Sequence, residues 1–105
     1  MTKAEKDAFY SKIIKQWGGD AVRVFYDFDD HIDVVEKEFM ASKISTQCRK
    51  IIIEDGLGWY GEEYSTQKYP FVEIYGNDRD QLMKTARKVV NHIHRHKNVY
   101  FKDRY

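Results

Sequence analysis

The chain contains little cysteine and little proline: Cys48 and Pro70 are the single examples among 105 residues. One cysteine excludes a disulfide framework and a cysteine-rich zinc module, so we expect a reducing, cytoplasmic location. One proline and six glycines leave no linker-like stretch, so residues 1–105 are expected to form a single domain. The longest aliphatic run spans only residues 51–53, so the sequence predicts no membrane span and no secretory signal.

Charge of either sign is nearly balanced, with 18 basic and 17 acidic residues and a net charge of +1. This balance excludes, by bulk charge, a polybasic nucleic-acid protein and a polyacidic DNA mimic. A hydrophobic content of 42% and a charged content of 33% are typical of a folded protein. The charges are nevertheless separated along the chain. Residues 20–38 hold seven acidic and two basic residues (net −5), and residues 84–104 hold seven basic and one acidic residue (net +6).

Hydrophobic periodicity and cap residues predict seven elements along the chain. The predicted elements are a helix over 2–17, a strand over 21–28, a helix over 29–46, a strand over 49–54, a strand over 69–75, a helix from 77 or 78 to about 96, and a strand over 99–101. Thr2 and Glu5 have capping-box spacing, and Ile32, Val35 and Phe39 have helical spacing. Residues 56–68 read as a long loop.

This order of elements predicts the α+β class. A two-layer sandwich of ferredoxin-like βαββαβ topology is expected over residues 21–103, preceded by a helix over residues 1–17. An alternative stays open, in which residues 22–39 form a hairpin that turns at 29–31 and the order becomes α-β-β-β-α.

Strand alternation predicts an aromatic and basic face on the sheet. If the aliphatic residues of strands 21–28 and 69–75 face the helices, four other side chains point the opposite way: Arg23, Phe25, Tyr69 and Phe71. Aromatic rings beside a guanidinium suit single-stranded nucleic acid, because bases stack on rings and phosphates pair with cations. The alternative is that this face is covered, either by the first helix with its Trp17 or by a second copy of the chain.

The same strands carry a local resemblance to a known family. Residues 68–74 are similar to a strand signature of the RNA recognition motif, with Tyr69 and Phe71 at its stacking positions, and residues 24–26 resemble that family's first-strand signature. The likeness covers about ten residues and departs from the signature at Lys68, Pro70 and Ile74. It implies stacking of single-stranded bases and does not assign the chain to the family.

The last predicted helix has a basic face opposite its apolar stripe. That face consists of Lys84, Arg87, Lys88 and Arg95, together with Asn91. Several cations on one rigid helix would bind phosphates. The alternative is a solvated face whose cations complement the helix dipole.

Three aromatic residues, Trp59, Tyr60 and Tyr64, lie in the glycine-framed segment that we predict as a loop. Tryptophan and tyrosine are the residue types that anchor protein interfaces, so this segment and the acidic residues 27–38 are candidate partner-binding surfaces. The alternative is that the rings fold back onto the core.

Metal-dependent chemistry has only weak support. Asp27, Asp29 and Asp30 follow the first predicted strand, and a parallel second strand would bring Glu54 and Asp55 to the same edge for Mg²⁺. The histidines at 92, 94 and 96 indicate a metal site only weakly, and the lone thiol indicates a nucleophile only weakly. We therefore expect no catalytic residue, no metal and no cofactor.

These observations predict a small non-catalytic regulatory protein that binds single-stranded nucleic acid or a nucleic-acid-handling complex. The alternative is a protein-interaction module or inhibitor, in some arrangements a homodimer, and a Mg²⁺-dependent nuclease is third.

Overall fold

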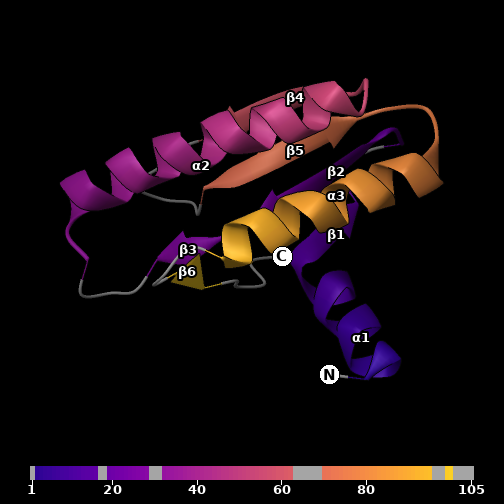
Figure 1. The fold of residues 1–105 in the computed structure, drawn as a ribbon, viewed down its shortest axis with the longest axis horizontal. Coiled ribbons are helices and arrows are strands. Elements are labelled where there is room, and N and C mark those ends of the chain that lie inside the picture. Colours follow the sequence, from indigo (N-terminus) through magenta and orange to yellow (C-terminus); the bar gives the residue numbers. More distant parts are fainter. Residues whose placement is uncertain (1, 17–18, 29–31, 63–69, 96–98, 101–105) are drawn as a thin grey trace.

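Two helices pack on one face of an antiparallel sheet in the computed structural model, which describes residues 2–16, 19–28, 32–62, 70–95 and 99–100 (Figure 1). The helices of this layer are α2 (Val34–Glu54) and α3 (Arg79–His94). The sheet contains β1 (Ile14–Gln16), β2 (Ala21–Phe25), β5 (Phe71–Tyr75) and β4 (Gly58–Glu62), side by side in that order. The predicted α+β class and two-layer arrangement are confirmed.

The remaining elements lie at the margins of the sheet. A second sheet pairs β3 (Asp27–Phe28) with β6 (Val99–Tyr100), and α1 (Lys3–Ile13) leads directly into β1. The ferredoxin-like strand order stays a prediction. That order would place the last strand, β6, beside β2, but β1 lies beside β2 and β6 pairs with β3. No helix in the described part of the chain is long and apolar enough to span a membrane.

The predicted strand over residues 49–54 is wrong, because α2 continues to Glu54. Ile44, Cys48 and Ile52 follow each other at four-residue spacing, and all three are fully buried. Burial of one helix face therefore outweighs the β-propensity of three consecutive isoleucines. The chain turns away just after the helix at Gly56, whose φ of 77° suits glycine, with hydrogen bonds of 2.9 Å from the Gly56 amide to the Ile53 carbonyl and 3.1 Å from the Leu57 amide to the Ile52 carbonyl.

Other boundaries also differ from the prediction, and the helix expected over 29–46 begins at Val34. The first helix ends at Ile13 rather than at residue 17. The segment expected to be a loop contains β4, and the expected strand over 21–28 is divided into β2 and β3 at Tyr26. The hairpin alternative for residues 22–39 is also wrong, since residues 34–39 are helical and β3 pairs with β6.

The core lies between the helices and the sheet. The aliphatic residues predicted to face the helices do so, and each is at most 1% exposed: Val22, Val24, Val72 and Ile74. They meet the apolar stripe of α3, which is Leu82, Ala86, Val89, Val90 and Ile93. Cap residues fix the helix starts, because the Glu5 amide donates to Thr2 Oγ1 at 3.1 Å and the Asp80 amide donates to Asp78 Oδ1 at 2.9 Å.

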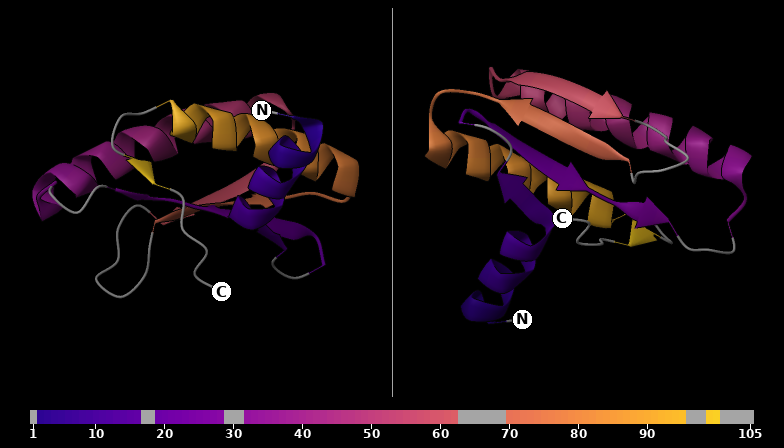
Figure 2. Two further views of the ribbon diagram at one scale, coloured as in Figure 1. Left: turned by 90° about the horizontal axis from the view of Figure 1, so that it is seen from below. Right: turned by 180° about the vertical axis from the view of Figure 1, so that it is seen from behind.

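Helix α1 stands beside the helix layer. Tyr10 donates a hydrogen bond of 2.7 Å from its hydroxyl to Asn91 Oδ1 on α3. Figure 2 shows α1 on the same side of the sheet as α3. The described part of α1 therefore does not lie across the opposite face of the sheet, where one alternative had placed it.

Candidate functional site

The sheet face turned away from α2 and α3, called here the second face, holds the predicted aromatic pair. Phe25 and Phe71 are register partners on β2 and β5, and their ring centroids are 5.4 Å apart. The two residues are 2% and 4% exposed, so the face assignment is right but the rings are buried. Tyr69, the third predicted aromatic, lies outside the described residues.

Arg23 is engaged with its own neighbours on the second face. Its guanidinium lies 4.1 Å from the centre of the Phe71 ring, and its Nε forms an ion pair with Glu73 Oε2. The side chains of Arg23 and Glu73 are 15% and 6% exposed. Because the carboxylate balances the guanidinium and the guanidinium covers one face of the ring, neither group is presented to an incoming base or phosphate.

Two tyrosines border this buried group. Tyr60 on β4 is 48% exposed and Tyr75 on β5 is 41% exposed. The Tyr75 hydroxyl donates to the Glu73 carboxylate, and this hydrogen bond, with some burial, raises the pKa of Tyr75. Glu73 was not predicted to be a functional residue, although it is the one charged residue in a strand of aromatic and aliphatic residues.

The basic residues of α3 are partly neutralised by neighbouring carboxylates. Lys88 Nζ lies 3.0 and 3.1 Å from the two carboxylate oxygens of Asp55, and Arg87 lies 3.5 Å from Asp7. Lys84 on α3 and Arg95, the residue that caps the end of α3, are exposed. Since α3 covers the opposite side of the sheet from Phe25 and Phe71, the structure does not bring the two predicted nucleic-acid surfaces together (Figure 2).

Asp55 links the end of α2 to α3. Thr85 donates to Asp55 Oδ2 at 2.5 Å, and Gln81 Nε2 donates to the Asp55 carbonyl at 2.8 Å. The hydrogen bond from Thr85, followed by that from Lys88, lowers the pKa of the Asp55 carboxyl. This contact holds the two helices of the layer together at one end.

The predicted partner-binding aromatics divide between the two faces of β4. Trp59 is half-buried and packs against the core, with the Arg49 guanidinium 5.5 Å from its ring centre. Tyr60 points to the second face, where its ring centroid is 6.0 Å from that of Phe71. Tyr64 lies outside the described residues. Trp59 thus folds back onto the core, whereas half of Tyr60 is available to a partner.

The most exposed apolar surface lies on α2 and was not predicted. Val35, Phe39 and Ile53 are 76%, 60% and 51% exposed. The surface that they mark is called here the α2 outer face and comprises Val35, Phe39, Ser42, Thr46, Arg49 and Ile53. These residues recur at alternating spacings of four and three, which is the pattern of a helix that packs against another helix. Val35 and Phe39 indicated a helix in the sequence, but they lie on its outward side.

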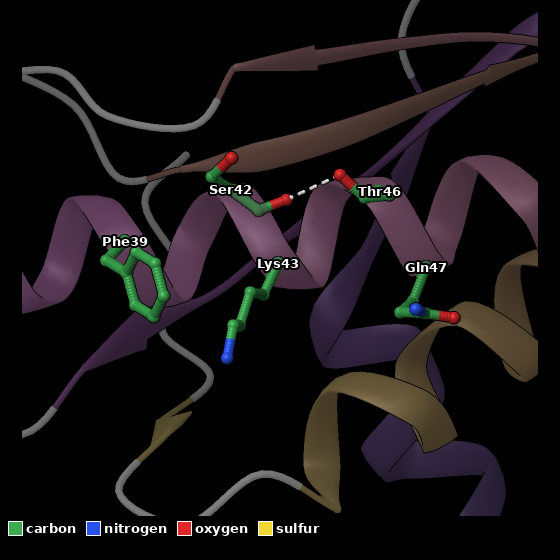
Figure 3. A pocket seen from close by; sticks show the side chains of 5 residues that line it. All are labelled: Phe39, Ser42, Lys43, Thr46 and Gln47. Carbon is green, nitrogen blue, oxygen red and sulfur yellow. Dashed lines mark hydrogen bonds between the residues drawn. The ribbon is translucent and has the colours of Figure 1, made fainter.

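Two shallow surface pockets follow one another along this face. The first, of about 350 Å³, is lined by Phe39, Ser42, Lys43, Thr46 and Gln47 (Figure 3). The second, of about 360 Å³, is lined by Thr46, Arg49, Lys50, Ile53 and Glu54. Thr46 lines both pockets, and its hydroxyl donates to the Ser42 carbonyl at 2.9 Å.

The evidence for metal or nucleophilic chemistry remains weak. The described residues contain no group of three potential metal ligands, and the side chains of Asp27, Asp29 and Asp30 fall outside the described set. The expectation that Glu54 would reach them through a parallel strand is wrong, because Glu54 ends α2. Burial raises the pKa of the Cys48 thiol to about 12, so it is not an activated nucleophile.

The described residues thus offer three surfaces. They are the second face, on which Arg23 and Glu73 pair with each other, the partly neutralised basic surface of α3, and the exposed apolar face of α2. Comparison with protein-family models, curated proteins and solved structures found no match.

Proposed function

We propose that this chain is a non-catalytic interaction module that binds a protein partner through the α2 outer face. One observation carries the proposal. Of the six large hydrophobic side chains that are exposed in the described part of the chain, four lie on α2. Exposed apolar side chains concentrated on one element are typical of a recognition surface.

The size of this surface fits recognition by another helix or by a groove. Val35 and Ile53 lie 18 positions apart on the helix, which corresponds to roughly 27 Å. Complete burial of one such valine, phenylalanine or isoleucine side chain contributes about 1.5–3 kcal/mol. Apolar anchors at spacings of three and four residues are what a helix presents to its partner.

A capture experiment tests this proposal. The full chain is immobilised and the bound proteins are compared with those bound by Phe39→Asp and by Lys84→Ser, a matched exposed position on α3. We expect the same partner on the wild type and on Lys84→Ser, and none on Phe39→Asp, while all three give the same circular dichroism spectrum. Equal capture by Phe39→Asp would refute the role of this face.

The second candidate function is binding of single-stranded nucleic acid, for which the supporting observation is the set of exposed cations on α3. Lys84, Lys88 and Arg95 lie on the outside of this helix, and Lys88 would have to exchange Asp55 for a phosphate. A titration with single-stranded RNA and DNA across salt tests the idea. Lys88→Ala should reduce the slope of the logarithm of the binding constant against the logarithm of the salt concentration by roughly one. If nothing binds at low salt, this candidate is eliminated.

We also propose that the fold is a variant of the ferredoxin-like arrangement. Support comes from the order β2-α2-β4-β5-α3-β6 and from the antiparallel pairing of β2 and β4 with β5. In this proposal β3 prolongs β2 beyond Tyr26, so that β6 takes the fourth strand position. An experimental structure in which Val99 pairs with a strand other than β3 would contradict it.

A further inference from the structure

We infer that the partner of the α2 outer face is a second copy of this chain, bound so that the two α2 helices run antiparallel about a two-fold axis. The inference rests on the proposed function, because it names the partner of that same face. It is drawn from the charge along α2, the placing of its apolar residues and the position of β4 beside it.

Charge is divided along the helix. Residues 33–42, which include the cap residue, hold three acidic residues and one basic residue, whereas residues 43–54 hold three basic residues and one acidic residue. Two parallel copies would therefore place acid beside acid and base beside base. Two antiparallel copies place the acidic half of each helix beside the basic half of the other, so complementary charge selects this orientation.

The charged side chains needed for this contact are exposed. Glu36, Glu38 and Lys50 are all solvent-exposed, and among the described residues no ion pair joins any of them to another side chain. Lys43, at the middle of the helix, lies 4.6 Å from the centre of the Phe39 ring. A second copy would supply the missing partners without breaking an ion pair within the chain.

The apolar residues match under the same symmetry. With the axis beside Ile44, Val35 faces the partner's Ile53, and Phe39 faces the partner's Arg49, whose guanidinium can stack on the ring. Ser42 then faces the partner's Thr46 at the centre, where short side chains allow close approach of the helices. The two ends of the contact are therefore formed by apolar side chains, and its centre is formed by short side chains.

The edge strand of the sheet lies under this part of α2. A Cβ placed on Gly61 of β4 would be 2.5 Å from Ser45 Oγ, so the middle of β4 lies beside the middle of α2. β4 is the last strand of the four-stranded sheet, and Figure 1 shows it along the same edge of the molecule as α2. A stable interface needs about 800 Å² from each partner, and the edge of β4 extends the area that α2 offers.

Light scattering and sedimentation over about 1–200 µM protein test the stoichiometry, a range that spans typical weak to moderate dimers. We expect twice the monomer mass for the full chain and the monomer mass for Phe39→Asp, with Ile53→Glu as a second variant if the first unfolds. A monomer at every concentration overturns this inference but leaves the proposed function standing if the capture experiment depends on Phe39. A dimer that neither variant weakens uses another surface and also overturns this inference, and the proposed function is then decided by the capture experiment alone.

Two further variants test the orientation. Reversal of the acidic half, Glu36→Lys with Glu38→Lys, should weaken the dimer roughly tenfold, because like charges then face each other where opposite charges did. Addition of Arg49→Glu and Lys50→Glu to the same chain should restore it. Mild oxidation should cross-link a mixture of Val35→Cys and Ile53→Cys chains, while either variant alone stays uncross-linked. A disulfide in Val35→Cys alone would mean parallel helices and overturn the inference.

Discussion

The ion pair between Arg23 and Glu73 should dominate the stability of the second face, and Glu73→Gln is the variant that tests it. Glutamine keeps the shape of the side chain and removes its charge. The Arg23 side chain, which is 15% exposed in the wild type, then lies over the ring of Phe71 without the Glu73 carboxylate. The variant therefore measures the cost of removing the Glu73 charge from beside a guanidinium in a region that water hardly reaches.

The expected magnitude follows from burial. Removal of one partner from a buried ion pair costs about 3–5 kcal/mol. Arg23 keeps its contact with Phe71 and some access to water, so we expect the lower end, about 3 kcal/mol. For a domain of this size each kcal/mol lowers the melting temperature by about 4–8 °C, so Glu73→Gln should melt more than about 10 °C below the wild type.

Urea denaturation at neutral pH gives the measurement, and two variants serve as controls. Tyr75→Phe removes one neutral donor to the Glu73 carboxylate and should cost about 1 kcal/mol. The double replacement of Arg23→Met with Glu73→Leu should cost less than Glu73→Gln alone, because no buried charge remains. If Glu73→Gln cost less than about 1 kcal/mol, or if the double replacement were simply additive, the pair would be solvated and our account of this face would be refuted.

Three other predictions follow from single contacts. Gly61→Ala should destabilise the fold by about 1–3 kcal/mol, because its Cβ would meet Ser45 Oγ at 2.5 Å, and Ser45→Ala should recover most of that loss in the same urea assay. Asp55→Asn should cost about 1–2 kcal/mol at pH 7. The lowered pKa of Asp55 means that its stabilisation is present above the ordinary value near 3.8 and is lost as pH falls through the lower folded value, so the denaturation curves of variant and wild type should converge as the pH is lowered through that value. Cys48, with its pKa raised to about 12, should resist a thiol reagent in the folded protein and react after unfolding.

Local chemistry made part of the fold predictable. The capping box at Thr2 and the cap at Asp78 mark helix starts, because their side chains bond amides only two or three residues away. The alternation of Val22 and Val24 assigned the face of β2, because neighbouring side chains on a strand must point to opposite faces. In each case the determining contact lies within a few residues of sequence.

The site was less predictable because its determining contacts are distant in sequence. The partner of Arg23 is Glu73, 50 residues away, and nothing near either residue indicates the pair. Strand alternation placed Arg23 and Phe71 on the second face but could not show that one covers the other. A buried ion pair of this kind is therefore visible only once β2 and β5 are placed side by side.

The run of isoleucines at residues 51–53 shows why the α2 outer face escaped notice. In a strand, alternate residues of the run would be buried together, and the helix before it would end near residue 46. In a helix, the three side chains point in three directions, so Ile51 is half-buried, Ile52 is fully buried and Ile53 is 51% exposed. The run that continues the core face of α2 therefore also places an isoleucine on its outward side. Only when the helix is extended to Glu54 does Ile53 fall in line with Val35 and Phe39, and the apolar face then has two ends, as an antiparallel partner requires.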